Sequence, residues 1–169
     1  MSLNHIQLNP NMLAGLYTDK LVEGNRMPSA SVQHHQPDTQ EPKFLGSNRK
    51  NIVVVINNGS AAFLPDDELA FLSSILAACK LSLADIAIVN LANTSSAALE
   101  SLIHARARTV LLFGIGPLSI GLPINFPEYQ LQAFDQRTYL HAPPLSLLQS
   151  DKSQKLKLWN SLKNLFGIA

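Results

Sequence analysis

Short runs of apolar residues recur along the C-terminal two-thirds of the chain. Residues 52–56 (Ile-Val-Val-Val-Ile), 86–89 (Ile-Ala-Ile-Val) and 110–114 (Val-Leu-Leu-Phe-Gly) contain no charged or amide side chain. Runs of this length, rich in β-branched residues, are typical of strands that are buried on both faces of a parallel sheet. We therefore predict three core strands over these residues.

Between these runs, apolar residues recur at helical spacing. One stripe follows Pro65, which is favourable in the first turn of a helix, and three acidic residues stand where the helix dipole favours them. A second stripe follows Thr94 or Ser95, either of which can cap a helix N-terminus. Strands that alternate with helices indicate right-handed crossovers over a parallel sheet. The predicted fold class is α/β, a three-layer sandwich with a mainly parallel central sheet.

The pattern changes after Gly114. Prolines and glycines between residues 117 and 127 leave no room for a long helix. Residues 130–134 and 138–140 are candidates for short strands. We therefore expect the second half of the body to be rich in loops, with two further strands.

The chain is predicted to end in a turn and a helix. Residues 141–146 (His-Ala-Pro-Pro-Leu-Ser) should form a stiff turn, because each proline fixes its own φ and restricts the residue before it. A final amphipathic helix should begin after Asp151 or Ser153 and run to about Phe166. Gly167 is suited to end it.

The N-terminal third has a different character. Residues 1–22 carry an amphipathic stripe that predicts a short helix from Pro10 onward. Residues 23–50 are rich in proline, glycine and polar residues and contain few apolar anchors, so we interpret them as a linker. Residues 51–169 are then the folded α/β domain.

Composition narrows the classes of function. Hydrophobic residues make up 46% of the chain and the formal net charge is +1, so the chain as a whole does not indicate a nucleic-acid or membrane partner. The first residues lack the features of a signal peptide, and no apolar stretch is long enough for a membrane helix, so we expect a cytoplasmic protein. The single cysteine, Cys79, lies in an apolar run and is expected to be buried, and no metal site is predicted.

In parallel α/β sheets, ligands bind beyond the carboxyl ends of the strands. The predicted strand ends here offer the turn that begins at His141 and three loops, at residues 57–60, 90–93 and 114–117. These loops match neither a dinucleotide-binding nor a P-loop fingerprint, and no cofactor is predicted. A catalytic triad would need an acid close to His141, and Asp135 is the nearest candidate in the sequence. Turn formation is the simpler interpretation of these loops.

The last predicted helix carries two further features. Its lysines could bind phosphate groups, but lysines on a helix more commonly form a basic face that is exposed to solvent. Trp159 either fills the core or forms an exposed anchor for a partner, and the core position is the favoured interpretation. The lysines are Lys152, Lys155, Lys157 and Lys163.

Two of these segments resemble the uracil-DNA glycosylase superfamily. Residues 110–114 look like that family's third core strand, and residues 141–146 resemble its late His-Pro-Ser-Pro-Leu-Ser loop. In active members the histidine of this loop contacts the flipped uracil and the leucine wedges into the duplex, roles that would fall to His141 and Leu145. The family's Gly-x-Asp-Pro motif is replaced here by residues 57–63, where no Asp-Pro follows the glycine. The resemblance therefore implies a glycosylase-like fold that lacks the catalytic motif.

A catalytically silent family is similar over nearly the whole chain: the psi subunits of the bacterial DNA polymerase III clamp-loader complex. The similar points are the amphipathic residues 8–22, the opening strand at 52–56, and the ending formed by residues 142–145 and 156–159. The resemblance implies an N-terminal segment that tethers to clamp-loader subunits, a linker and a glycosylase-like domain. Within this N-terminal segment, the residues expected to bind that partner are Leu8, Met12, Leu13, Leu16 and Tyr17.

Three hypotheses of function follow. The first is a non-catalytic replisome adaptor that joins the clamp loader to another protein and retains a vestigial pocket at Asn57, Asn58, Gly59 and His141. The alternative is a divergent DNA glycosylase that uses His141 with Asn57 or Asn58. A third is an α/β domain that binds a small molecule or nucleotide. Contact with DNA is left open by the sequence.

Overall fold

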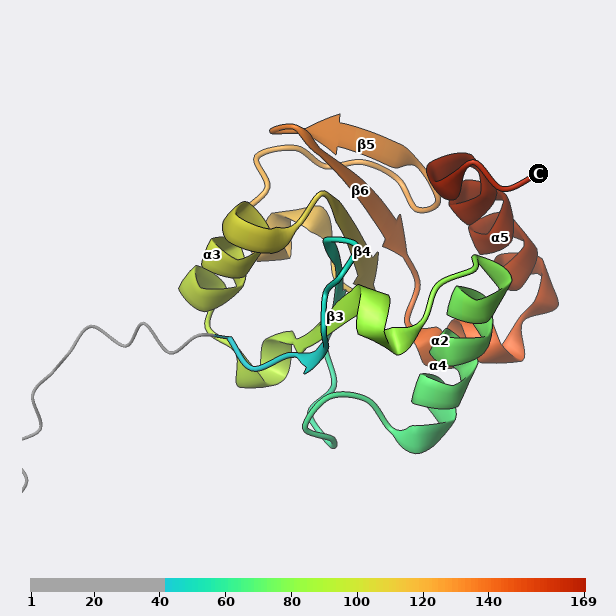
Figure 1. Ribbon diagram of the computed structural model, residues 1–169, viewed down its shortest axis with the longest axis horizontal. Helices are drawn as coiled ribbons and strands as arrows, with labels where there is room; N and C mark the ends of the chain where they lie inside the picture. The colour runs from blue at the N-terminus through green and yellow to red at the C-terminus, as the bar shows by residue number, and fades with distance from the viewer. Residues whose placement is uncertain (1–41) are drawn as a thin grey trace, which may run out of the picture. The chain divides into compact units, whose positions relative to one another are not determined.

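The computed structural model describes residues 42–169. In this part of the chain six strands form one mixed sheet, and four α-helices pack around it (Figure 1). The strands are β1 (Leu45–Gly46), β2 (Ile52–Ile56), β3 (Ile86–Asn90), β4 (Thr109–Phe113), β5 (Leu131–Phe134) and β6 (Arg137–Ala142). The helices are α2 (Asp66–Ala78), α3 (Ser96–Arg106), α4 (Leu145–Ser150) and α5 (Lys152–Phe166).

The strand order is β1-β3-β2-β4-β6-β5. The four inner strands, β3, β2, β4 and β6, run parallel to one another, whereas β1 and β5 pair antiparallel with them at the two edges. The inner strands contain the three apolar runs, since a strand covered on both faces needs apolar side chains on both. The predicted α/β class and the mainly parallel sheet are therefore confirmed.

Helices cover both faces of the sheet. Alternate residues of β2 separate into two core clusters, with Val54 on one face and Val53 and Val55 on the other. The Val54 cluster includes buried leucines of α2, α4 and α5. The Val53 cluster includes buried residues of α3 and of the loop from Ile115 to Phe126. Figure 1 shows α3 on one side of the sheet and the other three helices on the opposite side.

The helix ends follow the capping residues predicted from the sequence. The Ser95 side chain accepts a hydrogen bond from the backbone N–H of Ala98, and Asp151 accepts from the N–H groups of Ser153 and Gln154. Gly167, with φ of +62°, ends α5 in the left-handed conformation that glycine favours. Asp151 rather than Ser153 is thus the cap of the last helix.

The segment from His141 to Ser146 differs from the predicted stiff turn. His141 and Ala142 complete β6, and only the two prolines connect it to α4. Pro144 precedes the helix, where its missing N–H has no intrahelical role and its φ of −54° suits the entry. Leu145 and Leu148 of α4 are almost fully buried, so packing stabilises this six-residue helix although its sequence is short and proline-flanked.

The folded body also begins before Asn51, within the range predicted as linker. Leu45 and Gly46 of β1 pair with Ile88 and Ala87 of β3. The Asn48 side chain donates a 2.8 Å hydrogen bond to the carbonyl oxygen of Arg106, at the end of α3. These contacts depend on partners 40 to 60 residues away in the chain, which local composition does not indicate.

Gly46 gives a test of this extension. Its φ is +112°, and an added Cβ would contact the Ile86 oxygen and lie 2.6 Å from the Leu83 oxygen. Gly46→Ala should lower the free energy of unfolding by roughly 1–3 kcal/mol, because both the backbone conformation and the close contact oppose a side chain. Urea denaturation measures the change. Gly59→Ala is the matched control, since a Cβ there meets nothing within 4 Å, and an equal loss in both variants would contradict the prediction.

Two further expectations concern burial and membranes. Cys79 is buried, as predicted, and burial raises the pKa of its thiol above the usual range. Among residues 42–169, none of the helices has both the length and the apolar character that a membrane crossing requires.

Candidate functional site

The candidate site lies where the order of the parallel strands reverses. From β2 the chain passes first to β3 on one side and then to β4 on the other, so the carboxyl ends of β2 and β4 form a switch point. Ligands in open α/β sheets bind at such points. A pocket of about 140 Å³ is present there, lined by Ile56, Asn57, Asn58, Glu68, Phe113, Pro144, Leu145 and Ser146.

The loop after β2 is held in place by a buried amide on the neighbouring strand. Asn90, the last residue of β3, is 1% exposed. Its Nδ2 donates to the carbonyl oxygens of Asn58 at 2.7 Å and Ala61 at 3.0 Å. Its Oδ1 accepts from the backbone N–H groups of Asn58 at 3.0 Å and Ala92 at 3.1 Å. Both ends of the Asn90 side-chain amide therefore form their hydrogen bonds with backbone groups of the neighbouring loops.

Asn58 has a similar local role. Its Oδ1 accepts hydrogen bonds from the Ser60 N–H at 2.8 Å and the Ser60 hydroxyl at 2.7 Å. A side-chain oxygen that bonds the backbone two residues ahead closes an Asx turn. The side-chain oxygen of Asn58 therefore already accepts hydrogen bonds within the turn. Asn57, in contrast, is exposed at the edge of the pocket.

His141 lies on the face of the sheet opposite to the switch-point pocket. In β6 it follows Leu140, which belongs to the cluster packed on α2, α4 and α5, so the alternation of a strand places His141 on the opposite face. Its ring lies edge-on to Phe126, with ring centroids 6.4 Å apart. Its Nδ1 is buried and has no hydrogen-bond partner within the described part of the chain. His141 is therefore not among the residues that line the pocket.

The structure thus separates the four residues predicted as a vestigial pocket. Asn57 and Asn58 line the switch-point pocket, whereas Gly59 lies exposed outside its lining and His141 packs on the opposite face. Asn90 belongs to one of the strand-end loops that the sequence indicated, but it was not among the residues predicted for the vestigial pocket. Among the described residues that line the pocket, Glu68 is the one with a charged side chain.

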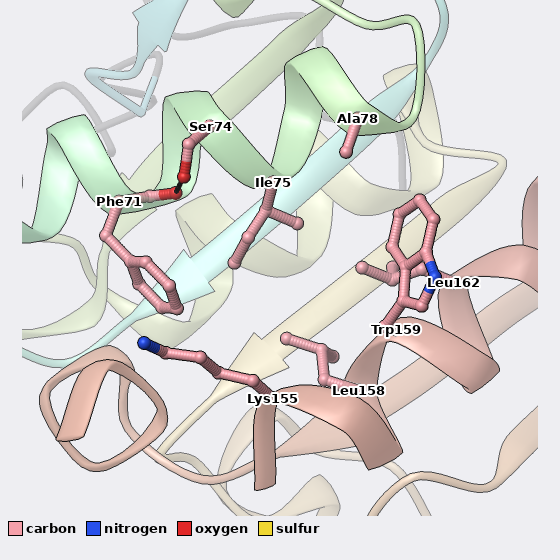
Figure 2. Close-up of a pocket in the computed structure, with 8 residues that line it drawn as sticks. All are labelled: Phe71, Ser74, Ile75, Ala78, Lys155, Leu158, Trp159 and Leu162. Atoms are coloured by element: carbon pink, nitrogen blue, oxygen red, sulfur yellow. Dashed lines mark hydrogen bonds between the residues drawn. The ribbon is translucent and has the colours of Figure 1, made fainter. Parts of the chain in front are cut away.

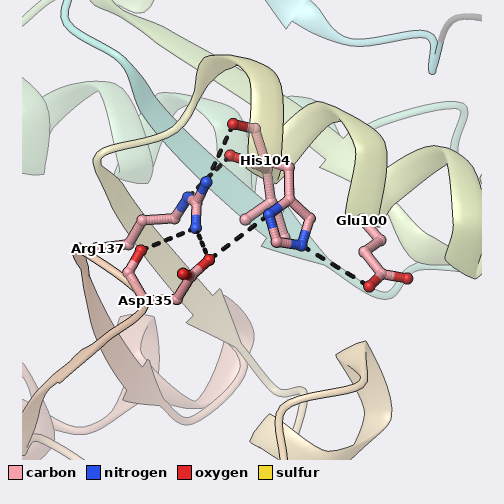
Figure 3. Close-up of polar contacts among 5 residues, drawn as sticks. Glu100, His104, Asp135 and Arg137 are labelled. Atoms are coloured by element: carbon pink, nitrogen blue, oxygen red, sulfur yellow. Dashed lines mark hydrogen bonds and ion pairs between the residues drawn. The ribbon is translucent and has the colours of Figure 1, made fainter.

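Asp135, the acid nearest His141 in the sequence, belongs to a different cluster (Figure 3). It stands in the turn before β6, whereas His141 is near the far end of that strand. The Asp135 carboxylate forms an ion pair with Arg137 and lies 3.6 Å from Nδ1 of His104. Asp135 is therefore not placed to act as the acid of a triad with His141, because the length of β6 separates them.

This cluster secures the C-terminus of α3. Arg137 donates hydrogen bonds to the carbonyl oxygens of Ile103 at 3.2 Å and His104 at 3.0 Å, which lie in the last turn of that helix. A cation at this position is favoured by the helix dipole. Nε2 of His104 lies 3.7 Å from Glu100, on the opposite side of the ring from Asp135, so the two carboxylates do not converge on one nitrogen. Residues 42–169 contain no group of three or more ligands placed to hold a metal ion.

The residues predicted to bind a partner, Leu8, Met12, Leu13, Leu16 and Tyr17, lie outside the described residues. Comparison of the sequence with protein-family models finds no match, and no curated protein matches it significantly.

Proposed function

We propose that the chain is a non-catalytic replisome adaptor, similar to the psi subunits of the bacterial DNA polymerase III clamp-loader complex. Residues 1–22 bind clamp-loader subunits, and the α/β domain binds a second replisome protein. The proposal starts from the resemblance of residues 8–22, 52–56, 142–145 and 156–159 to psi-like chains. A titration of purified clamp loader with the full chain tests it directly.

One structural observation supports the non-catalytic part most strongly. The amide of Asn90 and the side-chain oxygen of Asn58 bond the loops at the strand ends, and His141 packs on the opposite face of the sheet. Hydrolysis of a glycosidic bond needs groups that face the substrate together, one to activate water and one to stabilise the leaving base. The arrangement supports a scaffold in which the polar groups of this region stabilise the fold.

A glycosylase-like fold is part of the proposal. Four parallel inner strands with helices over both faces are compatible with the three-layer sandwich that the sequence resemblance implies. The sheet would then serve as a rigid platform, since its core residues are almost fully buried. In such an adaptor, binding surfaces are expected on the covering helices rather than at the strand ends.

The proposal predicts no release of uracil from single- or double-stranded DNA. The reason is that the alternative hypothesis needs His141 together with Asn57 or Asn58, and His141 does not face the pocket that these two asparagines line. An assay on uracil-containing oligonucleotides, with an active glycosylase as positive control, measures this. Uracil release by the purified chain that is lost in His141→Ala would contradict the proposal and support a divergent glycosylase.

A further inference from the structure

A groove runs between α2 and α5 on one face of the domain (Figure 2). It has a volume of about 210 Å³ and is lined almost entirely by apolar atoms. Figure 2 shows side chains from the two helices pointing toward each other across it. The main contributors are Phe71, Ile75 and Ala78 from α2, and Lys155, Leu158 and Trp159 from α5.

The floor of the groove is fixed and its walls are accessible. Leu158 and Leu162 belong to the core cluster and are each 2% exposed. Phe71, Ile75 and Trp159 pack against this cluster but are only partly buried. Trp159 is therefore neither a fully buried core residue nor a free anchor, but one wall of a groove that an apolar side chain can enter.

The segment that precedes β5 holds α5 in place. The Ser161 hydroxyl donates a 2.6 Å hydrogen bond to the Tyr129 carbonyl oxygen, and the Tyr129 hydroxyl donates to Oε1 of Gln154. Burial, with smaller contributions from Glu128 and Asp151, raises the pKa of Tyr129 to about 12, so this hydroxyl keeps its proton at neutral pH. The α5 wall is thus positioned before any ligand binds.

The charge beside the groove is positive and unneutralised. Helix α5 carries four lysines and no acidic residue, and within residues 42–169 none of these lysines forms an ion pair. The Lys155 ammonium group lies 5.2 Å from the centroid of the Phe71 ring, and Lys157 lies 5.9 Å from that of Tyr129. The stretch of α2 that lines the groove, residues 71–78, contains no charged side chain.

From this combination we infer that the α2–α5 groove binds an acidic segment of a partner protein, with a large apolar side chain of that segment inserted between Phe71 and Trp159. The inference rests on the proposed function, which requires a second protein partner for the α/β domain. An apolar anchor in a pocket with a complementary charge at its rim is a common form of peptide recognition.

A single-stranded nucleic acid fits the groove less well. Such ligands need several cations along a backbone path and open aromatic faces on which bases can stack. Here Lys155 is the lysine that lines the groove, and it covers the Phe71 ring. The remaining lining consists of aliphatic side chains, Ser74 and Trp159, and none of these carries a charge.

The test uses the full chain and the fluorescence of Trp159, which is its single tryptophan. The probe is a synthetic amphipathic peptide with glutamates on one face and leucine and phenylalanine on the other, without tryptophan or tyrosine. We expect a saturable change in tryptophan emission. A peptide with lysine in place of glutamate should bind at least about tenfold more weakly, because it meets Lys155 and its neighbours with like charge.

Two variants locate the site. Ala78→Phe fills the exposed end of the groove without changing its charge, and Lys155→Glu reverses the charge at its rim; each should weaken binding of the acidic peptide by about tenfold. Lys152→Glu is the matched control, since it makes the same charge change on α5 outside the groove lining, and should stay within about twofold. Circular dichroism and thermal unfolding confirm that each variant is folded.

Three outcomes would overturn the inference. These are no emission change with the acidic peptide, equal loss of binding in Lys152→Glu and Lys155→Glu, and saturable binding of an oligo-dT strand that displaces the peptide. Because the experiment contains no clamp loader, its failure is distinct from a failure of clamp-loader binding.

Discussion

Asn90→Asp should destabilise the α/β domain by roughly 3–5 kcal/mol. Asn90 is 1% exposed, and its Nδ2 lies within 3.0 Å of the carbonyl oxygens of Asn58 and Ala61. A carboxylate at this position can no longer donate, and its negative charge would face two carbonyl oxygens in a buried site. Urea denaturation followed by circular dichroism at neutral pH measures the loss.

Asn93→Ala is the control for this prediction. Asn93 also donates to the Ala61 and Ala62 carbonyl oxygens, at 3.4 and 3.1 Å, but it is exposed, so water can replace its bonds. Its removal should change the free energy of unfolding by no more than about 0.5 kcal/mol. If Asn90→Asp were as stable as Asn93→Ala, the loop network would not depend on the buried amide.

The double variant Leu13→Ala with Leu16→Ala should weaken binding to the clamp loader by well over tenfold. Both residues lie on the amphipathic stripe predicted for residues 1–22, and large apolar anchors at hot spots typically contribute about 2 kcal/mol or more each. The temperature of unfolding of the α/β domain should hardly change. Isothermal titration calorimetry and thermal unfolding on the same preparation measure both quantities.

Thr18→Ala, a polar position of the same segment, serves as the control and should bind as the unchanged chain does. A competing interpretation is that the stripe completes the core of its own domain. In that case the double variant would lower the unfolding temperature markedly, because Leu→Ala in a core costs roughly 2–5 kcal/mol. Lost stability with unchanged binding would exclude residues 1–22 as a tether.

The core of the fold could be predicted from the sequence because its signals are local. The run from Ile52 to Ile56 is buried at every position, and Ser95 and Asp151 cap helices that their sequences indicate. Helix α4 was not predicted, because two prolines suggest a turn and the burial of Leu145 and Leu148 depends on contacts with distant elements. Strand β1 has two residues, and its pairing with β3 cannot be inferred from either segment alone.

The candidate site was harder to predict because it depends on which face of a strand each residue occupies. Asn57 follows the core strand β2, and His141 lies near the end of β6. These positions in the sequence suggested that the two side chains share a pocket. The extension of β6 to Ala142 places His141 on the face that packs against Phe126, and a shift of one residue would have reversed that. Asn90 was recognisable as a polar strand end, but its partners in the loop after β2 became evident only from the fold.

The most direct test of the proposed adaptor function is a titration of the purified clamp loader of the same organism with two forms of the protein. These are the full chain and a chain that lacks residues 1–22, each monitored by analytical size-exclusion chromatography and calorimetry. The adaptor function predicts a stable complex with the full chain and loss of that complex with the shortened one, while the shortened chain keeps a cooperative unfolding transition. Absence of binding by the full chain, or equal binding by both forms, would contradict it.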